Sequence, residues 1–344
     1  MKRHHRNPLA YIEVHDSLLS SLDEPSSENR FSIVIIQNAV SDPLSEVLAL
    51  SGLRAACSVR LQAGGTWALR FRPIELKFNV VRRGECWLRV AGMQPAQLTA
   101  GDCFVIARTP FILSSGPDEE AVDASQVFSH AGASATFGMG EEVELLGGSV
   151  SLEGPAAVEL LETLPAALII PGASGGASSF NWLLDELDRE WQSNQPGAHT
   201  MCNDLLRLVF VHALRHHITT ADANDLSWLG GLRDPVIAKV LRAIHGAPEK
   251  TLRLAEMASI ACMSRSGFTA LFKARVGQAP VEYATRWRMQ VAASRLRNGA
   301  DNVTTVAASL GYLSDAAFGA AFRRVHGQSP GHYRREASAR APQE

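Results

Sequence analysis

Residues 254–280 read LAEMASIACMSRSGFTALFKARVGQAP, and residues 303–335 read VTTVAASLGYLSDAAFGAAFRRVHGQSPGHYRR. At a constant offset of 50, the serines, phenylalanines and Gly-Gln-X-Pro runs of the two stretches coincide, as Ser264 does with Ser314. Similarity at a fixed spacing is typical of a duplicated supersecondary unit. The sequence therefore predicts two copies of one folded unit in the C-terminal part of the chain.

Each copy has the pattern of a helix, a short turn and a second helix. Ser264 and Ser314 are placed as N-caps of the second helices, and each of these helices carries an apolar stripe at helical spacing. Gly277 and Gly327 follow as C-caps. Two helices in such a unit approach closely, which calls for small residues at the crossing. The candidates for that position are Ala258 and Ala308.

Residues 281–298, between the copies, predict one linking helix of about 25 Å. Trp287, Val291 and Leu296 are expected to face inward. The arginines Arg286, Arg288, Arg295 and Arg297 are expected to stay solvated. A rod of this length can hold two recognition helices about one DNA turn, roughly 34 Å, apart. A helical bundle with incidental basic residues is the alternative.

Length, composition and charge indicate a folded, multidomain chain. Its 344 residues suggest two or three domains, and 46% hydrophobic with 20% charged residues exclude disorder as the main state. No apolar run is long enough to span a bilayer, and no secretory signal is recognisable. Residues 251–344 hold 13 Lys+Arg and 6 Asp+Glu, a net charge of +7, whereas the remainder carries −9. This asymmetry favours a polyanion-binding module attached to a body with another role.

On these stretches, residues 245–336 resemble the DNA-binding domain of the AraC/XylS family of bacterial transcription regulators. The resemblance implies a DNA-binding domain over residues 233–336. Its helix-turn-helix units would cover about 252–276 and 303–326. It also implies double-stranded promoter DNA and RNA polymerase as partners, activation of transcription, and a homodimer.

The outward positions of the two second helices are the expected DNA contacts. Arg265 can pair with a guanine edge, and Lys273 is better placed for a phosphate. The second helix offers a short, nearly apolar surface, so the first is expected to carry most of the sequence discrimination. An ordinary solvated arginine is the alternative for Arg265. The candidate contacts are Arg265, Ser266, Thr269, Lys273, Asp315, Arg323, Arg324 and Arg334.

Residues 42–115 read as a short helix near Leu44–Leu50 followed by short β-runs between turn residues, which indicates a β-sandwich or barrel. TWALRFRP, RGECWLRVAG and LTAGDCFVIA resemble the cupin-type, AraC-binding-like sensor domain of one AraC branch, assigned to residues 41–165. The fold class is therefore α+β multidomain: an N-terminal cupin-like β-barrel, a helical hairpin, and a C-terminal all-α domain with two helix-turn-helix units.

Metal-dependent chemistry is disfavoured. Metal-binding cupins present clustered histidines with a carboxylate, but here the corresponding stretch reads Glu75-Leu76-Lys77-Phe78-Asn79. His212 and His216 could form half a site on a helix, although partly exposed helix histidines are the simpler interpretation. No metal, cofactor or enzymatic activity is expected.

A barrel without metal can still hold a small-molecule effector in its mouth. Candidate lining residues are Trp67, Arg70, Lys77, Trp87 and Arg108, with Phe71, Phe104 and Phe111 as further aromatics that could equally be core. Oxidation of a thiol is a second possible input, because the branch includes a reactive-chlorine sensor. The redox candidates are Cys57, Cys86 and Cys103. Five spread cysteines without a CxxC pair favour a reducing cytoplasm.

Residues 166–225 predict a helical hairpin, interpreted as a dimerisation element, with packing onto the barrel of the same chain as the alternative. Residues 221–225 are expected to form a linker. Residues 1–40 are expected to be a partly disordered extension and 337–344 a tail. The leading hypothesis is a cytoplasmic, sequence-specific AraC-type regulator. A cupin enzyme with a regulatory DNA-binding tail and a non-specific architectural DNA binder are the alternatives.

Overall fold

The computed structural model describes residues 42–128, 134–172, 177–193, 195–220, 227–299 and 301–340. The expected N-terminal extension, the linker at 221–225 and the last four residues of the tail lie outside this described part. A short helix, α1 (Pro43–Leu50), opens it, capped by the Asp42 carboxylate, which accepts from the N–H groups of Leu44 and Ser45. The helix expected near Leu44–Leu50 is thereby confirmed.

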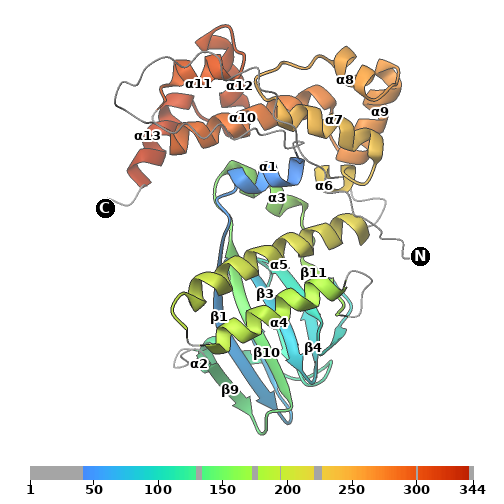
Figure 1. Cartoon of the computed structure of the whole chain (residues 1–344), viewed down its shortest axis with the longest axis vertical. Coiled ribbons are helices and arrows are strands. Elements are labelled where there is room, and N and C mark those ends of the chain that lie inside the picture. Colours follow the sequence, from blue (N-terminus) through green and yellow to red (C-terminus); the bar gives the residue numbers. More distant parts are fainter. Residues whose placement is uncertain are drawn as a thin grey trace, which may run out of the picture. The chain divides into compact units, whose positions relative to one another are not determined.

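Two β-sheets follow, and they share a hydrophobic core between them (Figure 1). Within the described residues, one sheet has six strands in the order β11-β6-β3-β10-β1-β9 and the other has five in the order β5-β4-β7-β2-β8. The first consists of β1 (Arg54–Gly64), β3 (Leu76–Arg83), β6 (Cys103–Ala107), β9 (Ser134–Gly138), β10 (Val143–Ser151) and β11 (Ala167–Ile170). The second consists of β2 (Ala68–Phe71), β4 (Glu85–Val90), β5 (Ala96–Thr99), β7 (Phe111–Ser114) and β8 (Val122–Asp123). The cupin-like β-fold expected from the short strands is confirmed.

The six-stranded sheet buries both of its faces, which the alternation along β3 makes visible. Leu76, Phe78 and Val80 belong to the core that continues into the helices, and Val80 is fully buried. Lys77 and Asn79 alternate with them and therefore face the five-stranded sheet. One strand thus contributes apolar side chains to one layer and polar side chains to the space between the sheets.

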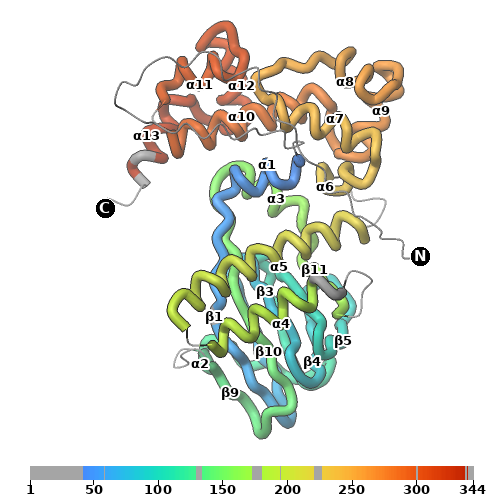
Figure 2. Tube along the Cα trace, viewed as in Figure 1, coloured from blue at the N-terminus to red at the C-terminus, as the bar shows by residue number. Residues whose placement is uncertain are grey.

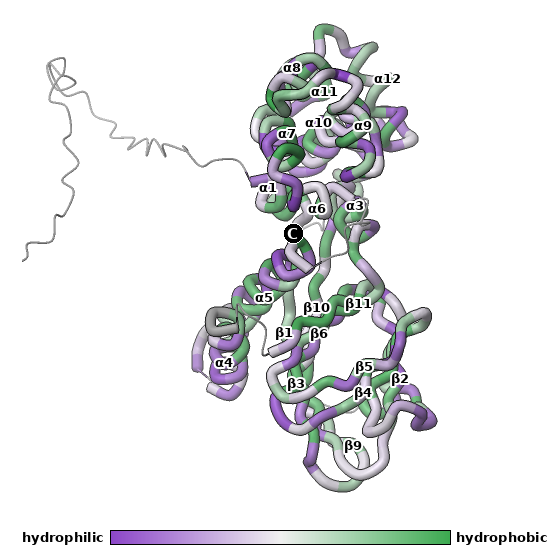
Figure 3. The backbone as a smooth tube through the Cα atoms, turned by 90° about the vertical axis from the view of Figure 1, so that its right-hand side faces the viewer, coloured by the Kyte–Doolittle hydropathy of each residue, from purple (hydrophilic) through white to green (hydrophobic). Residues whose placement is uncertain are grey.

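Helices α4 (Ala177–Ser193) and α5 (Ala198–Thr220) pack against each other, and α5 lies on β1, β10 and β11 (Figures 1 and 3). Arg82 of β3 pairs with Asp185 of α4 at 2.9 Å, and Arg60 of β1 pairs with Asp188. The apolar face of α5 therefore packs on the six-stranded sheet of the same chain, which agrees with the alternative that the hairpin packs onto its own barrel. Its buried residues are Cys202, Leu205, Leu206, Val209, Phe210, Ala213 and Leu214.

The remaining regular elements of the described part are helices (Figure 2). Helix α2 (Ser125–Phe128) lies between β8 and β9 in the chain order, and α3 (Pro155–Thr163) lies between β10 and β11. Helices α6 (Trp228–Gly231) and α7 (Pro235–Gly246) precede the duplicated region. The duplicated region forms α8 (Leu254–Ile260), α9 (Arg265–Val276), α10 (Pro280–Asn298), α11 (Val303–Ser309), α12 (Asp315–His326) and α13 (Pro330–Arg340). Helix α10 contacts α8, α9, α11 and α12, as a linking helix between two helix-turn-helix units should. Helix α13 continues four residues into the segment expected to be a tail.

The caps of both second helices are confirmed. The hydroxyl of Ser264 accepts from the Gly267 N–H at 3.2 Å, and that of Ser314 accepts from the Ala317 N–H at 3.2 Å. Gly277 and Gly327 follow in the left-handed conformation, with φ of 84° and 74°. The duplicated sequence therefore produces the same start and stop in each copy.

The offset of 50 fails for the first helices of the two units. The Met263 N–H donates to Ala258 O at 2.9 Å, and the Tyr312 N–H donates to Ala307 O at 3.1 Å, which are equivalent bonds 49 residues apart. Ala258 and Ala307 are buried, whereas Ala308 is exposed. The expectation for Ala308 is therefore wrong, because the second turn holds one extra residue, Leu313, which is fully exposed.

One arginine of the linking helix also departs from its expected place. Arg288 is only 7% exposed. Its Nη1 donates to Thr251 Oγ1 at 3.0 Å, and its guanidinium carbon lies 5.4 Å from the centroid of the Tyr312 ring. The expectation that Arg288 stays solvated is wrong, because periodicity gives the direction of a side chain but not the partners that it meets there.

Candidate functional site

Helix α9 exposes a polar face and buries an aromatic one. Phe268 and Phe272 are fully buried, with ring centroids 5.6 Å apart in an edge-to-face arrangement. This fixes the rotation of the helix, so that Arg265, Ser266 and Lys273 are exposed. No salt bridge of Arg265 or Lys273 occurs within the described residues. These side chains are thus placed to meet an external anion.

Thr269 is the least available of the candidates on α9. Its side chain is half-buried, and its hydroxyl donates to the carbonyl oxygen of Arg265 at 2.8 Å. The hydroxyl oxygen keeps acceptor capacity, so Thr269 can still accept from an amino group.

Helix α12 presents a different surface. Its Phe318 and Phe322 are fully buried like their counterparts on α9. The Asp315 carboxylate accepts from Thr304 Oγ1 at 2.7 Å, which ties this side chain to helix α11. Arg323 and Arg324 are exposed near the C-terminus of α12, and Arg334 is half-buried on α13. Helix α12 therefore offers exposed arginines and small side chains on its outer face, and few free hydrogen-bonding groups.

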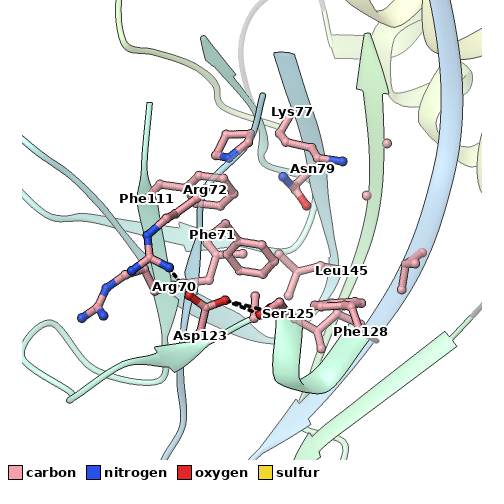
Figure 4. Close-up of a pocket in the computed structure, with 17 residues that line it drawn as sticks. Arg70, Phe71, Arg72, Lys77, Asn79, Phe111, Asp123, Ser125, Phe128 and Leu145 are labelled. Atoms are coloured by element: carbon pink, nitrogen blue, oxygen red, sulfur yellow. Dashed lines mark hydrogen bonds and ion pairs between the residues drawn. The ribbon is translucent and has the colours of Figure 1, made fainter. Parts of the chain in front are cut away.

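A cavity of about 390 Å³ lies between the two sheets (Figure 4). Its walls are mainly apolar: the Phe71 and Phe111 rings stack with centroids 4.8 Å apart, and Phe128 of α2 lies 5.9 Å from Phe71. The volume lies in the range of small-molecule sites, roughly 300–1,000 Å³. The lining residues are Val59, Leu61, Arg70, Phe71, Arg72, Pro73, Lys77, Asn79, Phe111, Leu113, Asp123, Ala124, Ser125, Phe128, Leu145, Gly147 and Gly148.

The charged groups around the cavity differ in whether they already have a partner. Arg72 pairs with Asp123, whose carboxylate also accepts from the Ser125 hydroxyl at 2.7 Å. The hydrogen bonds from Ser125 and the Arg72 contact lower the pKa of Asp123. Lys77 has neither a hydrogen bond nor an ion pair with any described residue, and its burial lowers its pKa. Figure 4 places Lys77 and Asn79 together, with Arg70 on the far side of the aromatic rings.

The five effector candidates do not all reach this cavity. Arg70 and Lys77 line it. Trp67 is 3% exposed in the core between the sheets, Trp87 is half-buried on β4, and Arg108 lines a separate polar hollow with Arg54 and Glu75. Of the further aromatics, Phe71 and Phe111 line the cavity, while Phe104 is buried against Phe111.

Sequence reasoning missed several lining residues. Asn79 was noticed only as a position without histidine, and Asp123, Ser125 and Phe128 lie in a stretch without clear periodicity. Gly147 faces Asn79 across the ladder between β10 and β3. A glycine inside a strand signals close approach or open space, and this signal could have singled it out.

The three redox candidates are shielded to different degrees. Burial raises the pKa of Cys86 to about 12 and that of Cys103 well above its usual value. Cys57 is half-buried beside Cys202, and burial raises its pKa as well. A raised pKa lowers the thiolate fraction that oxidants attack.

Histidines and acidic residues do not assemble a metal site in the part of the chain that the structure describes, where no group of three or more His, Cys, Asp or Glu is suitably placed. His212 instead lies 6.0 Å from the Phe180 ring. Among the described helices, none combines the length and apolarity needed to cross a membrane.

Comparison with known proteins agrees with this arrangement. Residues 42–219 match a family described as Cupin, and residues 257–336 match a helix-turn-helix domain. A putative AraC-like transcription regulator of Streptomyces lividans is 41% identical over 299 residues, covering 86% of this chain and 98% of the relative. The chain belongs to the AraC family of transcription regulators. It is thus a DNA-binding transcription regulator.

Two further proteins are similar to parts or all of this AraC-type chain. The RCS-specific HTH-type transcriptional activator RclR of Escherichia coli is 27% identical over 305 residues, covering 88% of this chain and 100% of the relative. The crystal structure of the AdpA DNA-binding domain in complex with a target DNA is 32% identical, with a TM-score of 0.30. That match covers 32% of this chain and 99% of the solved one.

Proposed function

We propose that this AraC-type regulator is a cytoplasmic, effector-controlled activator that reads its operator mainly through α9. The observation that carries the proposal is the Ser264-capped α9, which exposes Arg265, Ser266 and Lys273 over a fully buried Phe268–Phe272 face. Arginine can bind a guanine edge with two parallel hydrogen bonds, whereas α12 contributes Arg323 and Arg324 to the DNA backbone.

The test is a gel-shift titration on DNA upstream of the chain's own gene against scrambled DNA, over a salt series. Arg265→Ala should reduce the preference for the specific sequence by about tenfold or more, as loss of a bidentate base contact does. Arg275→Ala is the matched control, because Arg275 is on the same helix but pairs with Asp234 at 3.4 Å. Equal losses in both variants, or none in Arg265→Ala, would contradict the assignment. Binding that does not distinguish the two DNAs would indicate an architectural role.

The signal in this proposal is a small molecule in the cavity between the sheets. The cavity supports it because its apolar walls and few polar groups are typical of ligand sites. The thiols support it indirectly, since the raised pKa values of Cys57, Cys86 and Cys103 lower their reactivity towards oxidants. Mutating all three cysteines to serine should leave the induced response in place, as measured with a promoter fusion.

We also propose a homodimer formed through the outer face of α5. Leu208 and Met201 of this helix are 50% and 47% exposed, beside the residues that pack on the sheet. Leu208→Glu should convert a dimer into a monomer in sedimentation equilibrium. Leu313→Glu, at a fully exposed leucine elsewhere, should leave the dimer intact. A monomeric wild-type chain would overturn this part.

Activation through RNA polymerase is the remaining element of the proposal. It is supported by the word activator in the name of the 27% identical RclR protein. Transcription in vitro with purified bacterial RNA polymerase, on a template that carries the operator, should increase when the chain is added. A decrease would identify a repressor.

A further inference from the structure

The cavity between the sheets has a polar end built by a single strand. Lys77 and Asn79 leave β3 on the same face, which is otherwise lined by apolar side chains such as Leu145 and Leu61. Side chains on a face enclosed between two sheets are usually apolar. A lysine and an asparagine side by side on such a face therefore indicate a site for a polar ligand group.

The space beside these two residues exists because β10 carries a glycine there. Gly147 pairs with Asn79, and Ser149 pairs with Lys77. A Cβ at position 147 would lie 3.0 Å from Asn79 Oδ1, so any side chain would intrude on the polar end. The absence of a side chain leaves room for a ligand group beside Asn79, at the end of the cavity that Lys77 also lines.

The charge of Lys77 has no close counter-charge among the described residues. Glu75 exerts an attraction that raises its pKa, but burial dominates and lowers it. The other two cations differ: Arg72 is paired with Asp123, and Arg70 lies beyond the aromatic rings. Arg70, like Lys77, has no ion pair with a described residue, but of these two cations Lys77 is the one that lies beside Asn79 at the polar end.

We propose that the cavity binds a small carboxylate with an apolar body, the carboxylate lying against Lys77 and Asn79 and the body against Phe71, Phe111 and Phe128. Lysine and the asparagine amide both donate hydrogen bonds to a carboxylate. The stacked rings suit a flat or chain-like hydrocarbon and offer nothing to the hydroxyls of a sugar. This inference rests on the proposed function only in taking the cavity as the effector site.

The test uses 2-naphthoate and 2-naphthamide, which share an apolar body and differ in charge, titrated into the full chain by calorimetry without DNA. Wild type should bind the acid about tenfold more tightly than the amide, the scale of a hydrogen bond to a charged group. Lys77→Met should remove that preference and leave the amide unchanged. Arg83→Met, which removes a charge from the exposed end of the same strand, should keep it. Gly147→Ala should weaken both probes.

Equal affinity of wild type for the two probes overturns the proposal, as does a preference that persists in Lys77→Met. A decanoate and decanamide pair repeats the test with a linear body, and failure of both pairs to bind also overturns the proposal. Because binding is measured without DNA, a failed titration leaves DNA recognition by α9 intact. A failed gel shift likewise leaves the ligand assignment intact.

Discussion

The guanidinium carbon of Arg288 lies 5.4 Å from the centroid of the Tyr312 ring. Arg288 belongs to the linking helix α10, whereas Tyr312 lies in the turn of the second helix-turn-helix unit. The same guanidinium donates to Thr251, which precedes the first unit. One buried side chain of the linking helix thus contacts the turn of the second unit and the residue just before the first unit.

Arg288→Met should destabilise the chain by about 1–2 kcal/mol, because it removes a charged hydrogen bond and a cation–π contact while keeping the apolar stem. Urea unfolding measures the loss. Arg295→Met, at an exposed arginine of the same helix that donates to Ser309, should change stability by less than about 0.5 kcal/mol. Equal effects of the two variants would show that Arg288 contributes no more than a surface residue.

Cys262→Gly should stabilise the chain by about 1 kcal/mol. Cys262 lies in the turn of the first helix-turn-helix unit and has a φ of 53°. This left-handed conformation costs an L-residue about 1–2 kcal/mol, whereas glycine adopts it at little cost. The equivalent position of the second turn is Gly311, with a φ of 75°. The reciprocal change, Gly311→Ala, should destabilise, since its Cβ would meet Glu249 O at 2.3 Å. Cys262→Ala is the control and should bring no gain in the urea midpoint.

Ala320→Arg should raise the affinity for specific and scrambled DNA alike and steepen the salt dependence by about one phosphate contact. The reason is that Ala320 lies exposed on α12, where an added cation meets the backbone. Ala320→Leu adds bulk without charge and serves as the control. A gain confined to the specific operator in the gel shift would instead make α12 a reader of bases.

Acidification should lower the free energy of unfolding, because the folded chain disfavours protonation of the buried His245. Burial lowers its pKa to about 3, and it stacks on Trp287 with ring centroids 3.9 Å apart and lies 2.7 Å from the Tyr283 hydroxyl. The folded chain therefore holds fewer protons than the unfolded one below pH 6.5. Stability present above that pH should be lost by about 1.4 kcal/mol per pH unit as the pH falls towards 3.

Urea unfolding at pH 7, 6 and 5 tests this dependence. His245→Gln should flatten this dependence relative to wild type. An unchanged slope in His245→Gln would assign the acid sensitivity to other groups.

The helices of the DNA-binding domain could be predicted because their signals are local. Ser264, Gly277, Ser314 and Gly327 each set a helix end through their own backbone or side chain. The one-residue difference between the turns was missed because Ala308 fits the repeat as well as Ala307 does. The hydrogen bond from the Tyr312 N–H to Ala307 O and the burial of Ala307, but not Ala308, distinguish the two alignments.

The cavity was predicted less completely because it depends on contacts between distant strands. Lys77 and Arg70 were identified from their charge, but charge does not reveal that Arg72 is neutralised by Asp123, 51 residues further on. Trp67 and Trp87 have the right chemistry, but Trp67 is buried in the core just before β2, and alternation along β4 leaves Trp87 half-buried on the other face of that strand. Asn79 became informative only when its ladder partner was known to be Gly147.

One missing side chain on β10, at Gly147, leaves the space beside Asn79 open at the polar end of the cavity. A single codon change there, to alanine or serine, would narrow the polar end without touching α9, its caps or Arg288. Ligand preference and operator preference can therefore diverge independently among descendants of this gene, because a substitution at position 147 alters the cavity and leaves α9 unchanged.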